Sequence, residues 1–276
     1  MFVVLRAYPA PKGIIKKTKY RKKLIHEQTK TISTDKGLPF FMLDIPECPS
    51  TSEWDSIARK CGKYTSRIVA PRCLTLPDCG KLKRFVPSFM PSVLTFNTAV
   101  QTLEKSKIDP ASVTLTVTDR NGWHASRICR LLPFSSTVRV VTIKPERYCS
   151  VCKTALNEHG ASIVIRSAYE PSSKPDIVIC CDASESPAMK SAAIFGYKHS
   201  FEGKINFRGS KIELTEEHKK IIPSDIEPID FAGAITELCG AAEYKHSTFA
   251  HISSSCNVCD NLSPEACIKC YSSGNL

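Results

Sequence analysis

The stretch SVTLTVTDRNGWHASRICRLL (residues 112–132) predicts a strand, a sharp turn and the start of a helix, an arrangement that holds phosphate groups in many nucleotide-binding proteins. Gly122 opens the helix, and Asn121 before it tolerates an unusual backbone conformation. Asp119 ends the strand, where its carboxylate would repel a pyrophosphate unless a metal ion or Arg120 intervened. Alternatively, Asp119 binds the amides of its own turn. Two interpretations therefore stay open, a ligand-binding turn and a structural turn, and the single glycine favours the structural one.

Hydroxyl and basic side chains follow the next predicted strand. In dinucleotide-binding folds the ribose is recognised about 20 residues after the glycine loop. Counting from Gly122 reaches Thr142, in the stretch TIKPER, which also contains Lys144 and Arg147. The acidic residue that would bind a free 2′-hydroxyl is absent at this position. A hydroxyl group and positive charge suit a 2′-phosphate better, so the pattern favours NADP.

A further predicted strand, PDIVICCD (175–182), ends in two cysteines and an aspartate. Ligands of open α/β sheets bind outside the carboxyl ends of the strands. Successive side chains of a strand face opposite ways, so at most one of Cys180 and Cys181 faces a cleft there. We expect Asp182 and Ser184 to line that cleft.

On these motifs, residues 110–190 resemble the NADP-binding domains of shikimate dehydrogenases and glutamyl-tRNA reductases. TIKPER looks like an altered form of their Asn-Arg-Thr-type motif with its following basic residue, and PDIVICCDAS looks like their fourth strand, whose end lies over the nicotinamide. TDRNGWHAS stands where those families have a glycine-rich loop. The resemblance implies a Rossmann-like domain and an NAD(P)-dependent oxidoreductase, with no catalytic residue assigned.

The 14 cysteines include a C-x2-C-x7-C-x2-C pattern near the carboxyl terminus, formed by Cys256, Cys259, Cys267 and Cys270. Four thiolates complete a closed tetrahedral zinc site. The seven-residue spacer is shorter than the usual separation of such pairs. Zinc and an unliganded flexible tail are equally favoured, and an iron–sulfur cluster is a third alternative.

Two other groups have a chemical and a structural interpretation. Cys149 and Cys152 form a C-x-x-C at the start of a predicted helix, where a thiol pKa can be lowered, yet their spacing also places both on a core-facing side. We favour core packing. His124 and Asp119 would form an acid/base pair if a cleft lay at the turn, but a lone histidine in a first helical turn is more often structural.

The net charge of +11 is concentrated near the amino terminus, where residues 1–36 contain ten basic and two acidic residues, a net charge of +8. The remaining 240 residues therefore contribute only +3. Phosphate contacts dominate nucleic-acid binding, and an aromatic ring among lysines can stack on a base. The nucleic-acid candidates are Lys16, Lys17, Lys19, Tyr20, Arg21, Lys22 and Lys23. A solvated loop or lysine-protected edge strand is the favoured alternative, and an anionic membrane surface is another.

The pattern of strands and helices predicts an α/β protein with a Rossmann-like, mostly parallel sheet. Strands at 112–119, 137–144, 161–168 and 175–182 alternate with helices at 122–133 and 147–160, and a strand pair turns near Gly209. We expect three regions: a small amino-terminal α/β region with the basic segment (1–108), the Rossmann-like domain (109–250) and a cysteine-rich tail without a core pattern (251–276).

No apolar run is long enough to span a bilayer, and no signal peptide is evident, so we expect a cytoplasmic protein. The first functional hypothesis is a nucleotide- or NAD(P)-binding protein, with its site at the carboxyl ends of the strands. The alternative is a non-enzymatic module that binds nucleic acid or a protein partner, with a degenerate Rossmann core and a zinc-binding tail. A purely structural role is a third hypothesis.

Overall fold

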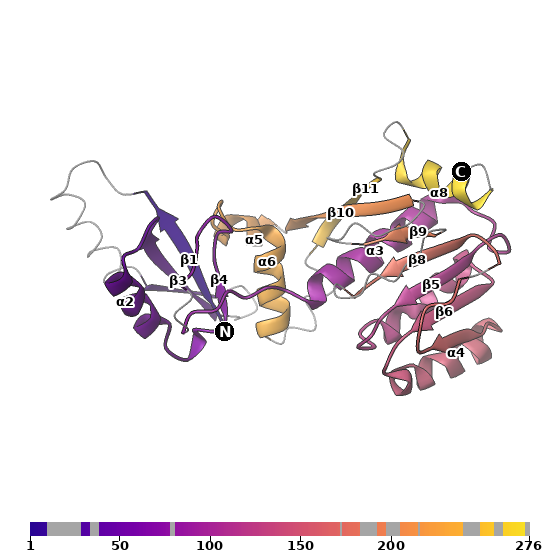
Figure 1. The fold of residues 1–276 in the computed structure, drawn as a ribbon, viewed down its shortest axis with the longest axis horizontal. Helices are drawn as coiled ribbons and strands as arrows, with labels where there is room; N and C mark the ends of the chain where they lie inside the picture. The colour runs from indigo at the N-terminus through magenta and orange to yellow at the C-terminus, as the bar shows by residue number, and fades with distance from the viewer. Residues whose placement is uncertain are drawn as a thin grey trace. The chain divides into compact units, whose positions relative to one another are not determined.

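The computed structural model describes residues 1–9, 29–33, 39–77, 81–171, 173–182, 192–196, 205–214, 216–239, 249–256 and 262–273. The protein is α/β, with parallel strands in both of its sheets. It divides into two compact units (Figure 1). Unit 1 comprises Met1–Met90 and Glu213–Ala250, and unit 2 comprises Pro91–Ile212 and His251–Leu276. These boundaries differ from the three consecutive regions expected from the sequence, because the chain returns to unit 1 after residue 212.

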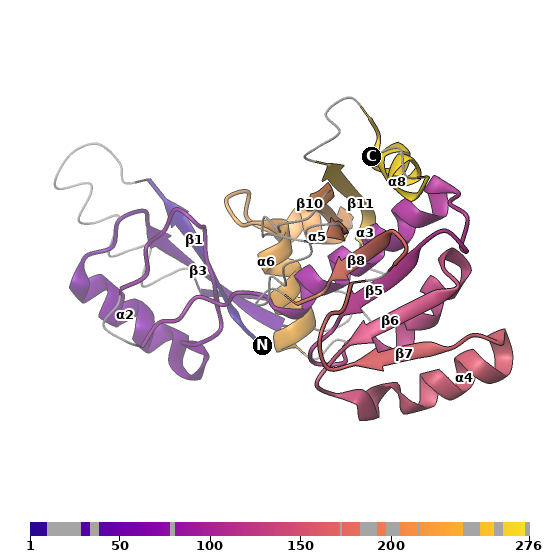
Figure 2. The ribbon, with the colours of Figure 1, turned by 45° about the vertical axis from the view of Figure 1, so that its right-hand side comes forward.

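Unit 2 contains a seven-stranded sheet in the order β11-β10-β9-β8-β5-β6-β7 (Figure 2). Its strands are β5 (Thr114–Thr118), β6 (Thr137–Val141), β7 (Ile163–Arg166), β8 (Asp176–Cys180), β9 (Ala193–Phe195), β10 (Ile205–Leu214) and β11 (Phe249–Cys256). The six strands from β5 to β10 pair in parallel. Numbered along the chain, these six follow the 3-2-1-4-5-6 order of the dinucleotide-binding fold. The order reverses between β5 and β8, which is the topological switch point of the sheet.

The central strands are buried on both faces, as is usual where helices cover both sides of a parallel sheet. All five residues of β5 and all five of β8 are buried. Helix α3 (Phe89–Ser106) contributes Phe96, Ala99, Val100 and Leu103 to the same core, at helical spacing. Between α3 and β8, unit 2 has three further helical segments, η2 (Ala125–Phe134), η3 (Pro145–Tyr148) and α4 (Cys149–His159). The helix predicted at 122–133 is thus a 3₁₀ helix in the structure, with Pro133 inside it.

The carboxyl-terminal segment belongs to the unit 2 core, which corrects the expectation of a tail without core contacts. Helix α8 (Pro264–Ser272) begins with the Ser263 side chain accepting a hydrogen bond from the Ala266 amide at 3.3 Å. Its buried face consists of Cys267, Ile268 and Tyr271, at helical spacing. The Tyr271 hydroxyl accepts a hydrogen bond from the Asp176 amide at 3.1 Å and donates one to the Asp176 carbonyl at 3.0 Å. Helix α8 is therefore fixed to the amino end of β8.

The predicted strand pair at 204–214 is wrong, because β10 is one continuous strand through Gly209. Strand β10 has β9 on one side and β11 on the other. Strands β9 and β11 were not predicted from the sequence.

Unit 1 contains a four-stranded sheet in the order β2-β3-β1-β4. Its strands are β1 (Val3–Tyr8), β2 (Thr29–Ser33), β3 (Pro39–Pro46) and β4 (Ile68–Val69), and its helical segments are α2 (Thr51–Cys61), η1 (Gly62–Tyr64), α5 (Glu216–Ile221), α6 (Pro228–Gly233) and the π-helical η4 (Ala234–Leu238). Strand β1 pairs in parallel with β3 and β4, whereas β2 is antiparallel to β3. Helix α2 begins with a capping box, in which Glu53 accepts the Ser50 amide at 2.6 Å.

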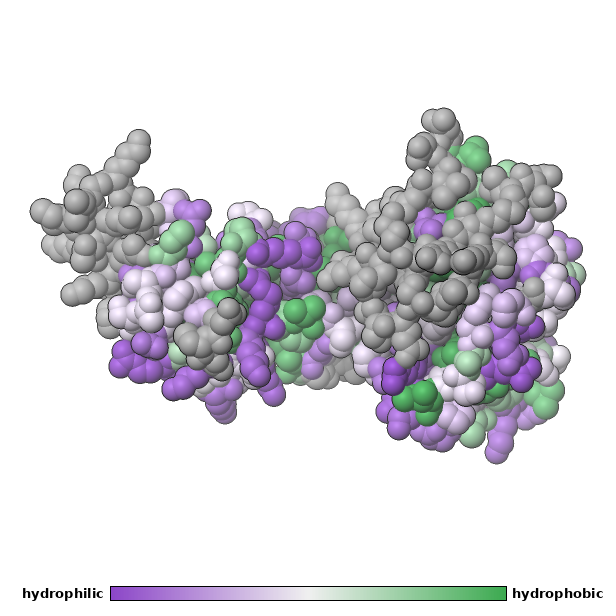
Figure 3. Space-filling model, in the orientation of Figure 1, coloured by the Kyte–Doolittle hydropathy of each residue, from purple (hydrophilic) through white to green (hydrophobic). Residues whose placement is uncertain are grey.

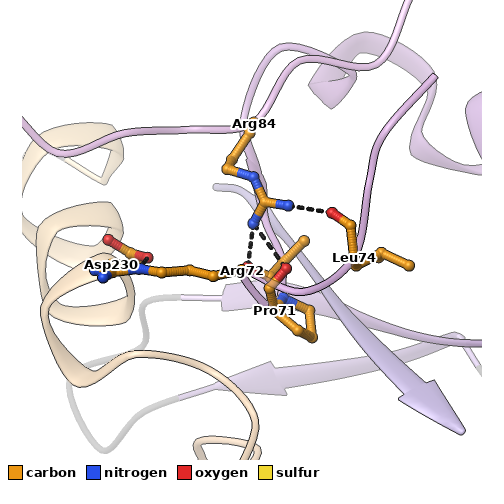
Figure 4. Close-up of polar contacts among 6 residues, drawn as sticks. Pro71, Arg72, Leu74, Arg84 and Asp230 are labelled. Carbon is orange, nitrogen blue, oxygen red and sulfur yellow. Dashed lines mark hydrogen bonds and ion pairs between the residues drawn. The ribbon is translucent and has the colours of Figure 1, made fainter. Parts of the chain in front are cut away.

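Polar contacts attach the returning segment to the amino-terminal strands within unit 1 (Figure 4). Arg72 forms an ion pair with Asp230 of α6 at 3.5 Å. The guanidinium of Arg84 donates to three backbone carbonyls of the loop after β4, those of Ala70, Pro71 and Leu74. Burial lowers the pKa of Arg84, but a guanidinium stays charged over the physiological range. The loop is therefore fixed where Arg72 can reach α6.

No helix among the described residues is long and apolar enough to cross a membrane. On the face shown in Figure 3, hydrophobic residues are scattered among hydrophilic ones. Among the residues that the structure describes, the exposed large hydrophobic side chains are likewise spread along the chain, at Val86, Ile143, Leu156 and Leu262.

Candidate functional site

Asp119 is completely buried at the carboxyl end of β5, where it organises the following turn. Its carboxylate accepts hydrogen bonds from the Trp123 amide at 2.9 Å, the His124 amide at 2.7 Å and the Tyr148 hydroxyl at 2.6 Å. Its backbone carbonyl accepts the Gly122 amide at 3.0 Å. Asp119 therefore binds the amides of its own turn, as the structural interpretation of the sequence expected.

A second carboxylate binds the same turn from across the switch point. Asp182 follows β8, and its side chain accepts the Arg120 amide at 2.6 Å. Together with the Asp119 contacts, this means that the amides of residues 120, 122, 123 and 124 all donate hydrogen bonds to oxygen atoms of the protein. In dinucleotide-binding proteins the amides at this position hold the pyrophosphate. Here protein carboxylates and a carbonyl occupy them.

The loop after β6 packs onto this turn. Gly122 has a left-handed φ of 66°, and a Cβ atom there would lie 2.7 Å from Cδ of Arg147. The aliphatic part of Arg147 therefore covers Gly122, while the residue as a whole is exposed. Burial and then the Asp119 charge raise the pKa of Tyr148, so its hydroxyl stays protonated and donates to Asp119. Because Tyr148 directly follows Arg147, this hydrogen bond holds the loop in place.

Thr142 holds the loop internally. Its buried hydroxyl accepts the Lys144 amide at 3.0 Å and donates to the Arg120 carbonyl at 3.2 Å. Lys144, like Arg147, is exposed. The structure therefore brings Asp119, Asn121, Gly122, Thr142, Lys144, Arg147 and Asp182 to one edge of the sheet. Among these, Lys144 and Arg147 present positive charge to solvent, whereas Asp119 and Thr142 are buried and serve the fold.

His124 lies below the turn in a closed environment. Its Nε2 is 2.6 Å from the Ser92 hydroxyl, and its ring stacks on Phe96 with centroids 5.0 Å apart. Burial lowers the pKa of His124 to about 4, although the Asp119 carboxylate opposes this shift. Burial also raises the pKa of Cys181, which is hydrogen-bonded to Ser92. Asp119 and His124 are therefore both buried, the histidine is neutral, and the pair does not line an open cleft.

The cysteine predictions have mixed outcomes. Cys152 packs against the unit 2 core, as expected, but Cys149 is exposed, so core packing was wrong for that residue. Cys267 is buried in the core and Cys270 is half-buried. Within the described ranges, no group of three or more His, Cys, Asp or Glu side chains is placed to hold a metal ion.

Several predicted residues lie outside what the structure describes. These are Ser184, the side chain of Cys256, Cys259, and the basic residues Lys16, Lys17, Lys19, Tyr20, Arg21, Lys22 and Lys23. The zinc site and the nucleic-acid segment therefore stay predictions.

Sequence reasoning missed two residues of this edge. Tyr148 was read only as part of a helix, although an aromatic hydroxyl close to a predicted ligand loop is a usable signal. Ser92 gave no signal, because its contact with His124 joins residues 32 positions apart.

Comparison of the sequence and structure with protein-family models, with curated proteins and with solved structures found no match in any of the three.

Replacing Tyr148 by phenylalanine is expected to reduce the free energy of unfolding by about 1.5–3 kcal/mol, because the buried Asp119 carboxylate then loses a hydrogen-bond donor. Urea denaturation measures the change. The control is Lys153→Ala at an exposed position of α4, which should change the stability by no more than about 0.5 kcal/mol. Equal stability of Tyr148→Phe and the wild type would contradict the role given to this hydrogen bond.

Acid should destabilise the protein through His124. The folded pKa of about 4 is below the ordinary value of 6.5, so the unfolded chain binds the proton first. The contribution of His124 is complete above pH 6.5 and is lost as the pH falls towards 4, by about 3 kcal/mol. Urea denaturation at several pH values should show a shallower slope for His124→Gln than for the wild type. The exposed His159→Gln variant should keep the wild-type slope, and parallel slopes for all three proteins would refute this assignment.

Proposed function

We propose that the protein binds a phosphate-bearing small molecule of the nucleotide class at the carboxyl edge of its six parallel strands. The observation that carries this proposal is the 3-2-1-4-5-6 strand order, with its reversal between β5 and β8. Ligands of open α/β sheets bind outside the carboxyl ends of the strands at such a switch point. The sequence-predicted residues that are described converge on this same edge.

The occupied amides restrict how such a ligand lies. A pyrophosphate on the turn would have to displace the Asp119 and Asp182 carboxylates, and it would meet their negative charge. Two further exposed cations, Lys144 and Arg147, lie on the β6 side, away from these carboxylate-bound amides. We therefore place a terminal phosphate monoester there, such as the 2′-phosphate of NADP, with guanidinium and ammonium groups as its partners. An oxidoreductase activity would require NADP binding, and no catalytic residue is assigned to it.

Thermal unfolding in the presence of candidate ligands tests this proposal, because a ligand that binds the folded state raises the Tm. We expect NADPH or 2′-AMP to raise the Tm more than NADH or adenosine does. Arg147→Ala should weaken this binding on the order of tenfold, since it removes a charge-assisted contact. The control variant is Lys269→Ala, an exposed cation on α8, which is attached to the opposite end of β8.

The result that would overturn the proposal is a Tm unchanged by every nucleotide tested in the wild type. Equal shifts with and without the 2′-phosphate would keep the site but exclude a phosphate contact with Arg147.

A second candidate function is favoured by the occupied amides themselves. A Rossmann-like sheet whose phosphate-binding amides are bonded to its own carboxylates suits a non-enzymatic scaffold. The binding surface would then be the basic segment, since residues 1–36 contribute +8 of the net charge of +11. Nucleic acid is the partner whose chemistry matches that charge.

Fluorescence anisotropy of the full chain with a labelled oligonucleotide tests this second candidate. Binding should weaken steeply as salt increases, because bound counterions are released from the phosphates. Replacement of Lys16, Lys17 and Lys19 by glutamine should reduce the salt dependence, whereas the same change at Lys153 and Lys269 should not. Absence of binding at low salt would exclude this function.

A further inference from the structure

Three cysteine thiols gather beside the candidate site without taking part in it. Cys149 is the first residue of α4 and is exposed, while Cys152 lies one turn later and is half-buried against the core. Cys129 of η2 is half-buried against the same core. Burial raises the pKa of Cys152, and the neighbouring Cys149 and Cys129 raise it further, so Cys152 lies within electrostatic reach of both. All three are free thiols.

We propose that Cys149 and Cys152 are a dithiol modification site, which a small-molecule disulfide oxidises to an intramolecular disulfide. Residues three apart on a helix have Cβ atoms about 5–6 Å apart, slightly more than a disulfide requires. Closing this gap requires a local adjustment at the start of α4, where the Cys149 amide bonds to the Glu146 carbonyl of η3 and not to a carbonyl of α4. The N-cap residue of α4 is Tyr148, whose hydroxyl binds Asp119, so its side chain does not cap the helix.

The exposed and half-buried positions assign different roles to the two thiols. Cys149 is exposed at the amino end of α4, where a small disulfide can reach its sulfur, so it is the attacking group. Its thiol contacts the Pro145 carbonyl at 3.8 Å, on the side of η3. Cys152 is kept protonated by burial and attacks second. Burial also raises the pKa of Cys129, so this third thiol is a bystander in the reduced protein.

The reaction consists of two thiol–disulfide exchanges. The Cys149 thiolate attacks one sulfur of the small disulfide, forming a mixed disulfide and releasing one small thiolate. Cys152 then attacks the Cys149 sulfur, forming the intramolecular bond and releasing the second small thiolate. The two released thiolates take the two protons that the cysteines lose. The protein is oxidised by two electrons and the small disulfide is reduced to two thiols.

Glutathione disulfide is the probe for the experiment, added to the reduced full-length protein under native conditions. After alkylation of the remaining thiols, trypsin releases residues 148–153 (YCSVCK), which contain both cysteines, and residues 128–130 (ICR), which contain Cys129. We expect the first peptide to lack both the alkyl groups and glutathione and to be two hydrogen atoms lighter than its reduced form. Residues 128–130 should be recovered alkylated, and dithiothreitol should restore alkylation of the first peptide.

Two variants separate the steps. Cys152→Ser should retain glutathione on Cys149, because the second attack cannot occur. Cys129→Ser should form the bond as the wild type does. The exposed Cys48 is the internal reference, and it should acquire glutathione more slowly than the Cys149–Cys152 bond forms.

The proposal is overturned if the wild-type peptide retains glutathione, if both of its cysteines remain alkylated, or if Cys149 is found cross-linked to Cys129. These readouts are masses of the protein itself, so they are independent of whether a nucleotide binds.

Discussion

One buried carboxylate determines the arrangement of the whole carboxyl edge of the sheet. Burying the Asp119 charge would be prohibitively unfavourable without hydrogen-bond donors, and the chain supplies two backbone amides and the Tyr148 hydroxyl. Trp123 lies in the turn after β5, His124 is the N-cap of η2, and Tyr148 ends η3. Hydrogen bonding to the buried charge therefore fixes the turn, the start of η2 and the end of η3 together. The position of Arg147 over Gly122 and the starting point of α4 follow from that constraint.

The same constraint explains how the strand order of a dinucleotide-binding fold occurs without its glycine pattern. Glycines are needed where a phosphate approaches the backbone closely. Here Asp119 and Asp182 bring their oxygen atoms to the amides as side chains, and no external anion has to approach. One glycine with a left-handed φ is then sufficient, because only the Arg147 side chain approaches the backbone closely, at Gly122. Positive charge for a ligand remains on the β6 loop, where backbone amides are not needed.

The sequence predicted the parts that depend on local pattern and missed those that depend on distant contacts. The strands β5, β6 and β8 were evident, because each is encoded by neighbouring residues. Helix α8 also had a local signal, Ser263 before Pro264, but its cysteines were considered only as metal ligands or as part of an unliganded tail. The bond between Asp119 and Tyr148 spans 29 positions, so no local pattern shows that these two residues are partners. The return of residues 213–250 to unit 1 likewise depends on pairs such as Arg72 and Asp230.

The interleaving of the two units affects the order in which the chain can fold during synthesis. Unit 2 begins at residue 91, yet its core includes Cys267, Ile268 and Tyr271 of α8. A ribosome-bound chain that has already produced all six parallel strands still lacks the helix that covers this part of the core. Apolar surface that remains uncovered in a partly made protein is prone to aggregation. Unit 2 therefore stays incomplete until after residues 213–250, the segment that closes unit 1, have been made.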